Sequence, residues 1–118
     1  MILVYVAGAY ASPEVITVLN NMGKGISAAA QLLQAGFAPF CPWLDGLFII
    51  QQGGMNTLTA DDMKRYSMAW LERSDCVCVI PGWEQSRGTK KEIERASELG
   101  IPVYYGIDRL MEAYAHDR

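Results

Sequence analysis

Four short, nearly continuous apolar runs constrain the fold of this chain more than any other feature of its sequence. They are Ile2–Ala7, Phe37–Cys41, Asp75–Ile80 and Ile101–Tyr105. Uninterrupted apolar runs of this length are typical of strands that are buried on both faces of a parallel sheet. Gly8 follows the first run and Pro42 the second, as expected at strand ends. We therefore predict a strand at each of the four runs.

Segments with helical patterns separate these strands. Ser12 is predicted to be the N-cap of a helix that has Pro13 and Glu14 in its first turn. The pattern continues to about Ala35, but Gly23 and Gly25 weaken the middle of so long a helix, so we expect a break near Asn20–Gly25. Further helices are predicted from Thr59 to about Arg73, from Thr89 to Gly100 and over Asp108–Ala115, whereas Trp43–Thr57 is the least regular segment.

This alternation predicts a single α/β domain over residues 1–118. The expected architecture is a doubly wound (flavodoxin-like or Rossmann-like) parallel sheet of about four strands, in the order 2-1-3-4, with helices on both faces. Ligands bind such sheets beyond the carboxyl ends of the strands, where the strand order reverses. Two loops, Gly8–Ser12 and Pro81–Thr89, are therefore the first places to look for a functional site.

Composition narrows the class of protein. The 118 residues carry a net charge of −3, with 51% hydrophobic and 19% charged residues, which indicates one globular domain and argues against disorder. No basic surface for a nucleic acid polymer or an anionic membrane is indicated, and no apolar run is long enough to span a bilayer. Cys41, Cys76 and Cys78 lie in apolar stretches, so we interpret them as free core residues of a cytoplasmic protein.

The single histidine, His116, excludes several kinds of active site. Histidine is the usual general base and the commonest metal ligand. A Ser–His or Cys–His pair and a multi-histidine metal centre are therefore both excluded. We expect neither a metal nor a cofactor, and any acid–base chemistry must use carboxylates, hydroxyls or lysines.

The loop after the third strand holds the strongest candidates for such chemistry. It begins with Pro81-Gly82-Trp83 and continues through Ser86 and Gly88 to Thr89 and Glu92. One interpretation is an anion site, because free N–H groups at a helix N-terminus suit a phosphate or a carboxylate. The other is structural: Thr89 and Glu92 have the spacing of a capping box, in which Glu92 bonds back to the Thr89 N–H.

Several motifs then follow one another in a characteristic order between residue 3 and about residue 105. They are Val4-Tyr5-Val6-Ala7-Gly8-Ala9-Tyr10, Asn21 with Leu32-Leu33-x-x-Gly36, Ala38-Pro39-Phe40-Cys41-Pro42, Trp70-Leu71-x-x-x-Asp75 and Pro81-Gly82-Trp83-x-x-Ser86-x-Gly88-x-x-x-Glu92. Together they resemble the nucleoside 2-deoxyribosyltransferase superfamily, which includes the 2′-deoxynucleoside 5′-phosphate N-hydrolases. In that superfamily a glutamate on the first turn of the helix attacks the anomeric carbon of a (deoxy)ribose. A covalent glycosyl-enzyme forms and the base departs.

The resemblance implies roles for individual residues of this chain. Glu92 falls on the nucleophile and Tyr5 on a strand tyrosine beside it. Gly8 and Tyr10 fall on the loop that closes round the sugar. Ser86 and Gly88 fall on the helix N-terminus that holds a sugar hydroxyl or a 5′-phosphate. Trp83 falls on an aromatic position that stacks on the base or packs in an oligomer.

One position departs from the pattern of the superfamily. Relatives carry an aspartate that protonates or positions the departing base, eight residues before the aspartate that opens the third strand; this chain has Ser67 there, counting back from Asp75. Ser67 stays among the candidate substrate-binding residues, although a serine cannot act as a carboxylic acid. Asp61 and Asp62 are interpreted as first-turn acids of a helix, and Asp45 is a candidate replacement for the missing acid.

The apolar segment Trp43–Asn56 has two interpretations, as the cover of a bound base with Gly53-Gly54 as a hinge, or as a contact between subunits. Superfamily sites are often completed by a neighbouring subunit, so we expect a homodimer or a larger homo-oligomer. The leading hypothesis is an enzyme that cleaves or transfers the N-glycosidic bond of a (deoxy)nucleoside or its 5′-monophosphate. The alternatives are a non-catalytic nucleotide-binding module of the same fold and a structural or interaction protein.

Overall fold

The computed structural model describes residues 1–51 and 58–115 and contains a four-stranded sheet. Its strands are β1 (Leu3–Ala7), β2 (Ala38–Phe40), β3 (Cys76–Val79) and β4 (Val103–Tyr105), in the order β2-β1-β3-β4. All neighbouring strands are parallel, and Tyr5 in β1 lies opposite Phe40 on one side and Val77 on the other. The predicted fold class and strand order are therefore confirmed.

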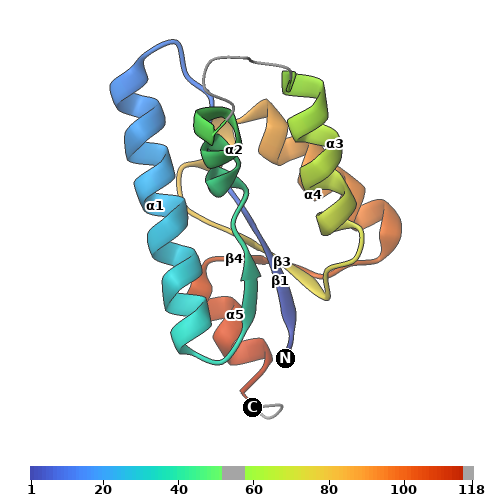
Figure 1. The fold of residues 1–118 in the computed structure, drawn as a ribbon. Helices are drawn as coiled ribbons and strands as arrows, with labels where there is room; N and C mark the ends of the chain where they lie inside the picture. The colour runs from blue at the N-terminus through green and yellow to red at the C-terminus, as the bar shows by residue number, and fades with distance from the viewer. Residues whose placement is uncertain (52–57, 116–118) are drawn as a thin grey trace.

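Helices cover both faces of the sheet (Figure 1). α1 (Val15–Gln34) and α5 (Ile107–Ala113) lie on one side, whereas α3 (Ala60–Leu71) and α4 (Arg87–Leu99) lie on the other. α2 (Gly46–Gln51) follows a 3-10 turn over Pro42–Asp45, and a second 3-10 turn over Trp83–Gln85 precedes α4. The loops that follow β1 and β3 reach the same edge of the sheet, because the strands are parallel.

The alternating side chains of β1 divide the core into two clusters. Val4 and Val6 pack in the cluster that contains Leu32 of α1 and Leu110 of α5. The intervening residues, Tyr5 and Ala7, pack in the cluster that contains Leu71 of α3 and Ala96 of α4. The Tyr5 side chain is fully buried, so its hydroxyl needs a hydrogen-bond partner inside the domain.

The first helix is continuous, and the break predicted near Asn20–Gly25 is wrong. α1 runs unbroken from Val15 to Gln34. Gly25 is buried, and a Cβ atom at this position would overlap the ring of Trp43. The glycine therefore permits close packing rather than a turn, and the contact offsets its weak helix propensity. The predicted start is also two residues early, since Ser12 Oγ accepts a hydrogen bond from the Glu14 N–H at 3.2 Å ahead of the helix.

The segment predicted to be least regular contains two short helical elements. Trp43, in the 3-10 turn, is buried beside α1 and donates its indole N–H to the Ala9 carbonyl at 3.1 Å. This packing supplies the structure that local patterns do not reveal. The predicted hinge at Gly53-Gly54 lies outside the described residues. By contrast, the predicted capping box at Thr59 and Asp62 is confirmed by reciprocal hydrogen bonds of 2.9 and 3.1 Å.

The cysteines are core residues, as predicted. Cys41, Cys76 and Cys78 are free and buried in the same cluster as Val4. Burial raises the pKa of Cys76 to about 11 and that of Cys78 to about 12, so both thiols stay protonated at neutral pH. Among the described residues, the structure contains no helix with the length and apolar character needed to cross a membrane.

Candidate active site

A tyrosine and a glutamate from opposite ends of the sequence meet on the α3 and α4 side of the sheet. The Tyr5 hydroxyl of β1 donates a hydrogen bond to Glu92 Oε2 of α4. Tyr5 points to this side because Val4 and Val6, its neighbours in the strand, point to the other. The structure thus brings together the two residues that were predicted to be catalytic.

Burial sets the charge state of Glu92. Its side chain is half-buried, and the loss of water raises its pKa from 4.5 to about 7. The hydrogen bond from Tyr5 favours the carboxylate and partly counteracts this rise. Burial, together with the negative charge of Glu92, raises the pKa of Tyr5 far above its ordinary value, so the phenol stays a donor. At neutral pH the pair is poised between a carboxylic acid and a hydrogen-bonded carboxylate.

Ser67 lies beside the Tyr5–Glu92 pair. It belongs to α3 and is one of two buried polar residues among those that the structure describes. Its hydroxyl lowers the pKa of the Tyr5 phenol, against the larger rise that burial and Glu92 cause. The side chain in the position of the superfamily aspartate therefore acts on Tyr5.

The N-terminus of α4 differs from the predicted capping box. Ser86 is the N-cap: its Oγ accepts from the Thr89 N–H at 3.2 Å and from Thr89 Oγ1 at 2.8 Å. Thr89 lies inside the helix and Glu92 bonds to Tyr5. The predicted capping box between Thr89 and Glu92 is therefore wrong. α4 begins at Arg87, which puts Glu92 on the second turn rather than the first.

Open space lies beside Gly88 in the first turn of α4. A Cβ atom added to Gly88 would meet nothing within 4 Å. In the described part of the chain, the Arg87 and Gly88 N–H groups have no hydrogen-bond partner. Two free N–H groups at a helix N-terminus suit an anion such as a phosphate. Ser86 Oγ is already engaged with Thr89.

The loop after β1 is held in place at the same edge of the sheet. The Tyr10 hydroxyl donates to Asp45 Oδ1 at 2.8 Å, and the Tyr10 carbonyl accepts from Asn21 Nδ2 at 3.2 Å. Burial raises the pKa of Asp45, while its hydrogen bond with Tyr10 lowers it. The charge of Asp45 also raises the pKa of Tyr5. A second carboxyl group therefore stands near the Tyr5–Glu92 pair.

Gly8 has a packing reason to be glycine. A Cβ atom at this position would lie 2.5 Å from Ile80 Cγ1 and 3.2 Å from the Trp43 ring. The loop after β1 is thus pressed against the start of the loop after β3. This close approach fixes the path of the chain towards Tyr10 and the Tyr10–Asp45 pair.

Sequence reasoning missed an aromatic cluster that borders the pair. Phe40 of β2 stacks on Tyr5 at 5.5 Å between ring centroids and on Trp70 of α3 at 5.5 Å. Tyr66, one turn before Trp70, contacts Phe40 at 5.7 Å and Phe48 of α2 at 5.5 Å. The spacing of Tyr66 and Trp70 already indicates one face of a helix, but only the sheet register shows that this face meets β2.

Trp83 packs against the same core cluster as Tyr5 but has a different ring partner. Its ring packs on Tyr105 of β4, with centroids 5.3 Å apart, and borders the core cluster of Val77 and Ala96. Within the described chain, its ring contacts do not include Tyr5 or Tyr10. Asp62 bonds to Thr59 and Arg65 at the start of α3, as expected of a first-turn acid.

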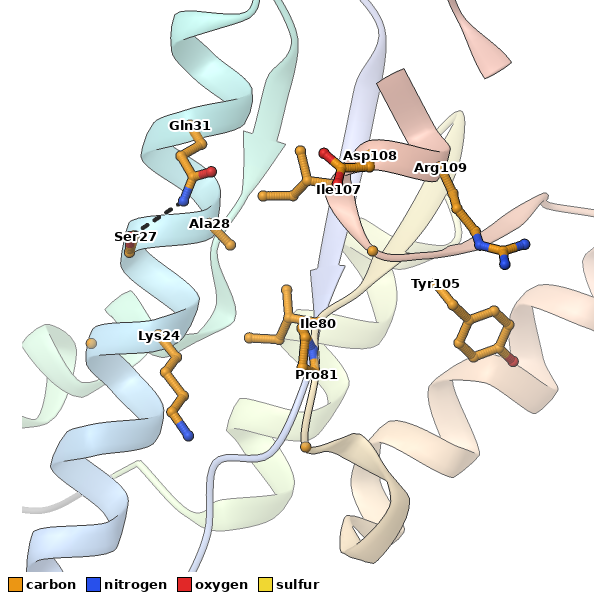
Figure 2. Close-up of a pocket in the computed structure, with 13 residues that line it drawn as sticks. Lys24, Ser27, Ala28, Gln31, Ile80, Pro81, Tyr105, Ile107, Asp108 and Arg109 are labelled. Atoms are coloured by element: carbon orange, nitrogen blue, oxygen red, sulfur yellow. Dashed lines mark hydrogen bonds between the residues drawn. The ribbon is translucent and has the colours of Figure 1, made fainter. Parts of the chain in front are cut away.

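A pocket of about 960 Å³ opens on the opposite side of the sheet, between α1 and α5. Figure 2 shows that the Arg109 and Tyr105 side chains point away from α1, whereas Lys24 extends toward the loop after β3. The charged side chains that line this pocket therefore do not converge on one ligand position. The Tyr5–Glu92 pair, with its converging polar groups, is the stronger candidate site.

Comparison with known sequences adds the family of the chain. The described residues include no cluster of three or more histidine, cysteine, aspartate or glutamate side chains able to hold a metal ion. No curated protein gives a significant match to the sequence. A family model covers residues 2–105, which span every strand and the whole candidate site. The chain belongs to the family described as "Domain of unknown function (DUF4406)".

Proposed function

We propose that the protein cleaves, or transfers, the N-glycosidic bond of a (deoxy)nucleoside or nucleoside 5′-monophosphate. The observation that carries the proposal is the hydrogen bond between Tyr5, in the middle of β1, and the half-buried Glu92 of α4, on the α3 and α4 face of the parallel sheet. A carboxylate held by a single donor keeps a free oxygen for attack. The resemblance to the nucleoside 2-deoxyribosyltransferase superfamily, with Glu92 and Tyr5 at matching positions, supports the same chemistry.

The proposed reaction has two displacements at the anomeric carbon. In the first, a Glu92 carboxylate oxygen bonds to C1′ while the C1′–N bond breaks, and its electron pair leaves with the base. In the second, water or another base attacks C1′ and the ester bond to Glu92 breaks. Water gives hydrolysis and a free sugar, whereas a second base gives transfer. Since Glu92 must be ionised to attack, activity should rise with pH through about 7.

Other residues have supporting roles in this proposal. Ser67 and Tyr5 hold Glu92 in one orientation. The free N–H groups of the first turn of α4, beside Gly88, would hold a sugar hydroxyl or a 5′-phosphate. Asp45 is the acid that would protonate the departing base in place of the missing aspartate, because its pKa is raised and it lies near Tyr5. No metal or cofactor takes part, and we expect the enzyme to act in the cytoplasm.

A non-catalytic nucleotide-binding module is the second candidate. The observation that favours it is Ser67, which supplies a hydroxyl to Tyr5 where superfamily enzymes supply an acid. If Asp45 does not replace that acid, the site would bind a nucleotide without cleaving it. Ligand-induced stabilisation without release of base would then be the result.

The test is release of free base from a panel of (deoxy)nucleosides and their 5′-monophosphates, followed by chromatography. We expect base release by the natural protein, and a loss of at least about a thousandfold in Glu92→Gln, because a missing nucleophile cannot be replaced by its amide. Glu94→Gln, at an exposed position on the same helix, should retain full activity. Base release that Glu92→Gln leaves intact would refute the proposal.

A further inference from the structure

The first helix presents a second apolar face that no part of the described chain covers. Its buried face consists of Gly25, Ala28, Ala29 and Leu32. A different set of large apolar side chains on α1 remains in solvent: Val15 is 71% exposed, Ile16 69%, Leu19 55%, Ile26 40% and Leu33 58%. In a soluble domain a contiguous apolar strip of this kind marks an interaction surface. Figure 1 shows α1 at the outside of the molecule.

The exposed apolar residues follow a strict pattern. Ile16, Leu19, Gly23, Ile26, Ala30 and Leu33 are separated by alternating steps of three and four residues, which is the seam of two paired helices. We call this set the α1 seam. At about 100° per residue it occupies roughly a quarter of the helix circumference. The neighbouring sector holds Thr17, Asn20, Lys24, Ser27 and Gln31, so polar residues begin where the seam ends.

Small and large residues alternate along the α1 seam in a way that suits a second copy of the same helix. In an antiparallel pair about a two-fold axis, Leu19 meets Ala30 of the partner subunit and Ile26 meets Gly23 of the partner subunit. At each end Ile16 meets Leu33 of the partner subunit. Each central layer then joins one large and one small side chain. A parallel pair would instead put glycine on glycine and leucine on leucine, which leaves alternating voids and clashes.

The exposed Gly23 and the uncharged positions beside the α1 seam also favour a second copy of α1 as its partner. Gly23 is exposed, and a Cβ atom added there would meet nothing within 4 Å of its own chain. Its small size is therefore not required inside the subunit, whereas a facing Ile26 would use the space. The positions that flank the seam on its solvent side are Asn20, Ser27 and Gln34. All are uncharged, and Lys24, the charged residue of the neighbouring sector, lies further round the helix.

We propose that the protein forms a two-fold symmetric dimer through antiparallel pairing of the α1 seam with that of a second copy. α1 has 20 residues and is about 30 Å long. A single helix pair of this length buries less than the roughly 800 Å² per partner of a standard interface, so we expect reversible association. The seam lies on the side of the sheet away from Tyr5 and Glu92. The dimer should therefore leave the candidate active site open.

The test is the mass of the protein in sedimentation equilibrium from about 1 to about 100 μM, a range suited to a reversible pair. We expect a shift from monomer to dimer. Leu19→Glu should weaken association by more than about tenfold, because it buries an unpaired charge in the seam. Thr17→Glu, with the same charge on the polar side of α1, should leave it unchanged. Circular dichroism and the melting temperature establish that both variants are folded.

A charge-pair rescue tests the antiparallel register. In the double variant Leu19→Glu/Ala30→Lys, an antiparallel pair brings each introduced carboxylate opposite an introduced ammonium of the other copy, so dimerisation should return. A parallel pair would bring like charges together and show no rescue. Absence of rescue, a monomer at every concentration, or a dimer that Leu47→Glu on α2 disrupts and Leu19→Glu does not, would each overturn the proposal. None of these outcomes depends on whether the protein cleaves nucleosides.

Discussion

Replacing Glu92 with glutamine isolates the ionisation of one carboxyl group and gives the sharpest test of the site geometry. In the folded protein the pKa of Glu92 is about 7, against 4.5 when the side chain is exposed. The folded state therefore binds a proton more tightly than the unfolded chain. The stability contributed by this proton is fully present below pH 4.5 and is lost as the pH rises through about 7.

The magnitude follows from the shift in pKa. One pKa unit corresponds to about 1.4 kcal/mol, so the full effect of Glu92 on the free energy of unfolding is about 3 kcal/mol. Most of it, about 2.5 kcal/mol, falls between pH 5 and pH 8. Glu92→Gln cannot titrate and keeps a similar shape. Relative to this variant, the natural protein should be about 2.5 kcal/mol more stable at pH 5 than at pH 8.

Urea unfolding followed by circular dichroism at pH 5 and pH 8 measures this difference. The comparison of natural protein and Glu92→Gln at each pH cancels the titration of all other groups, provided that the slopes of the unfolding curves agree. Glu94→Gln, at an exposed position on the same helix, serves as the matched control. If the free-energy difference between the natural protein and Glu92→Gln is the same at both pH values, Glu92 is not a buried acid with a raised pKa, and the reasoning fails.

Four further substitutions test other parts of the account. Gly25→Ala should destabilise the protein by about 1–3 kcal/mol, because the added methyl group overlaps Trp43. Gly23→Ala should instead stabilise dilute protein by about 0.5–1 kcal/mol, because alanine has the higher helix propensity. Equal effects of the two substitutions in urea unfolding would contradict the packing argument. Ser86→Ala should lose about 1 kcal/mol with the cap of α4, and an unchanged unfolding midpoint would show that the cap is dispensable. Asp45→Asn should slow release of poor leaving-group bases by roughly a hundredfold and activated bases much less; equal slowing of both would argue against an acid at this position.

The sheet was predictable because its strands are buried on both faces. Runs such as Val4–Ala7 must be apolar at every position, so they are recognisable without knowledge of their neighbours. The alternation of strands and helices indicated a parallel sheet, and the order 2-1-3-4 was the natural expectation for a doubly wound sheet of this size. What the pattern did not reveal was the continuity of α1. Local sequence patterns mark Gly25 as a weak point in the helix. A glycine is needed there because Trp43, from another element, packs directly against it.

The candidate site was predictable only in part. Glu92 and Tyr5 are 87 residues apart, and no local pattern joins them; the family resemblance pointed to both. The start of α4 was ambiguous, because Ser86 and Thr89 are both good N-cap residues. The structure resolves it by burying Thr89 and bonding it to Ser86. Likewise, the contact between Tyr10 and Asp45 depends on how the loop after β2 folds back over the loop after β1, which is a tertiary effect.

The central claim is that Glu92 forms a covalent bond to the anomeric carbon of a nucleoside. The most direct measurement is intact-protein mass spectrometry after rapid acid quench of a reaction with a nucleoside that the protein cleaves, followed by peptide mapping. The account predicts that a fraction of the protein gains the mass of one glycosyl group, attached at Glu92, and that Glu92→Gln gains none. Free base released with no adduct at any quench time, or an adduct on another residue, would contradict it.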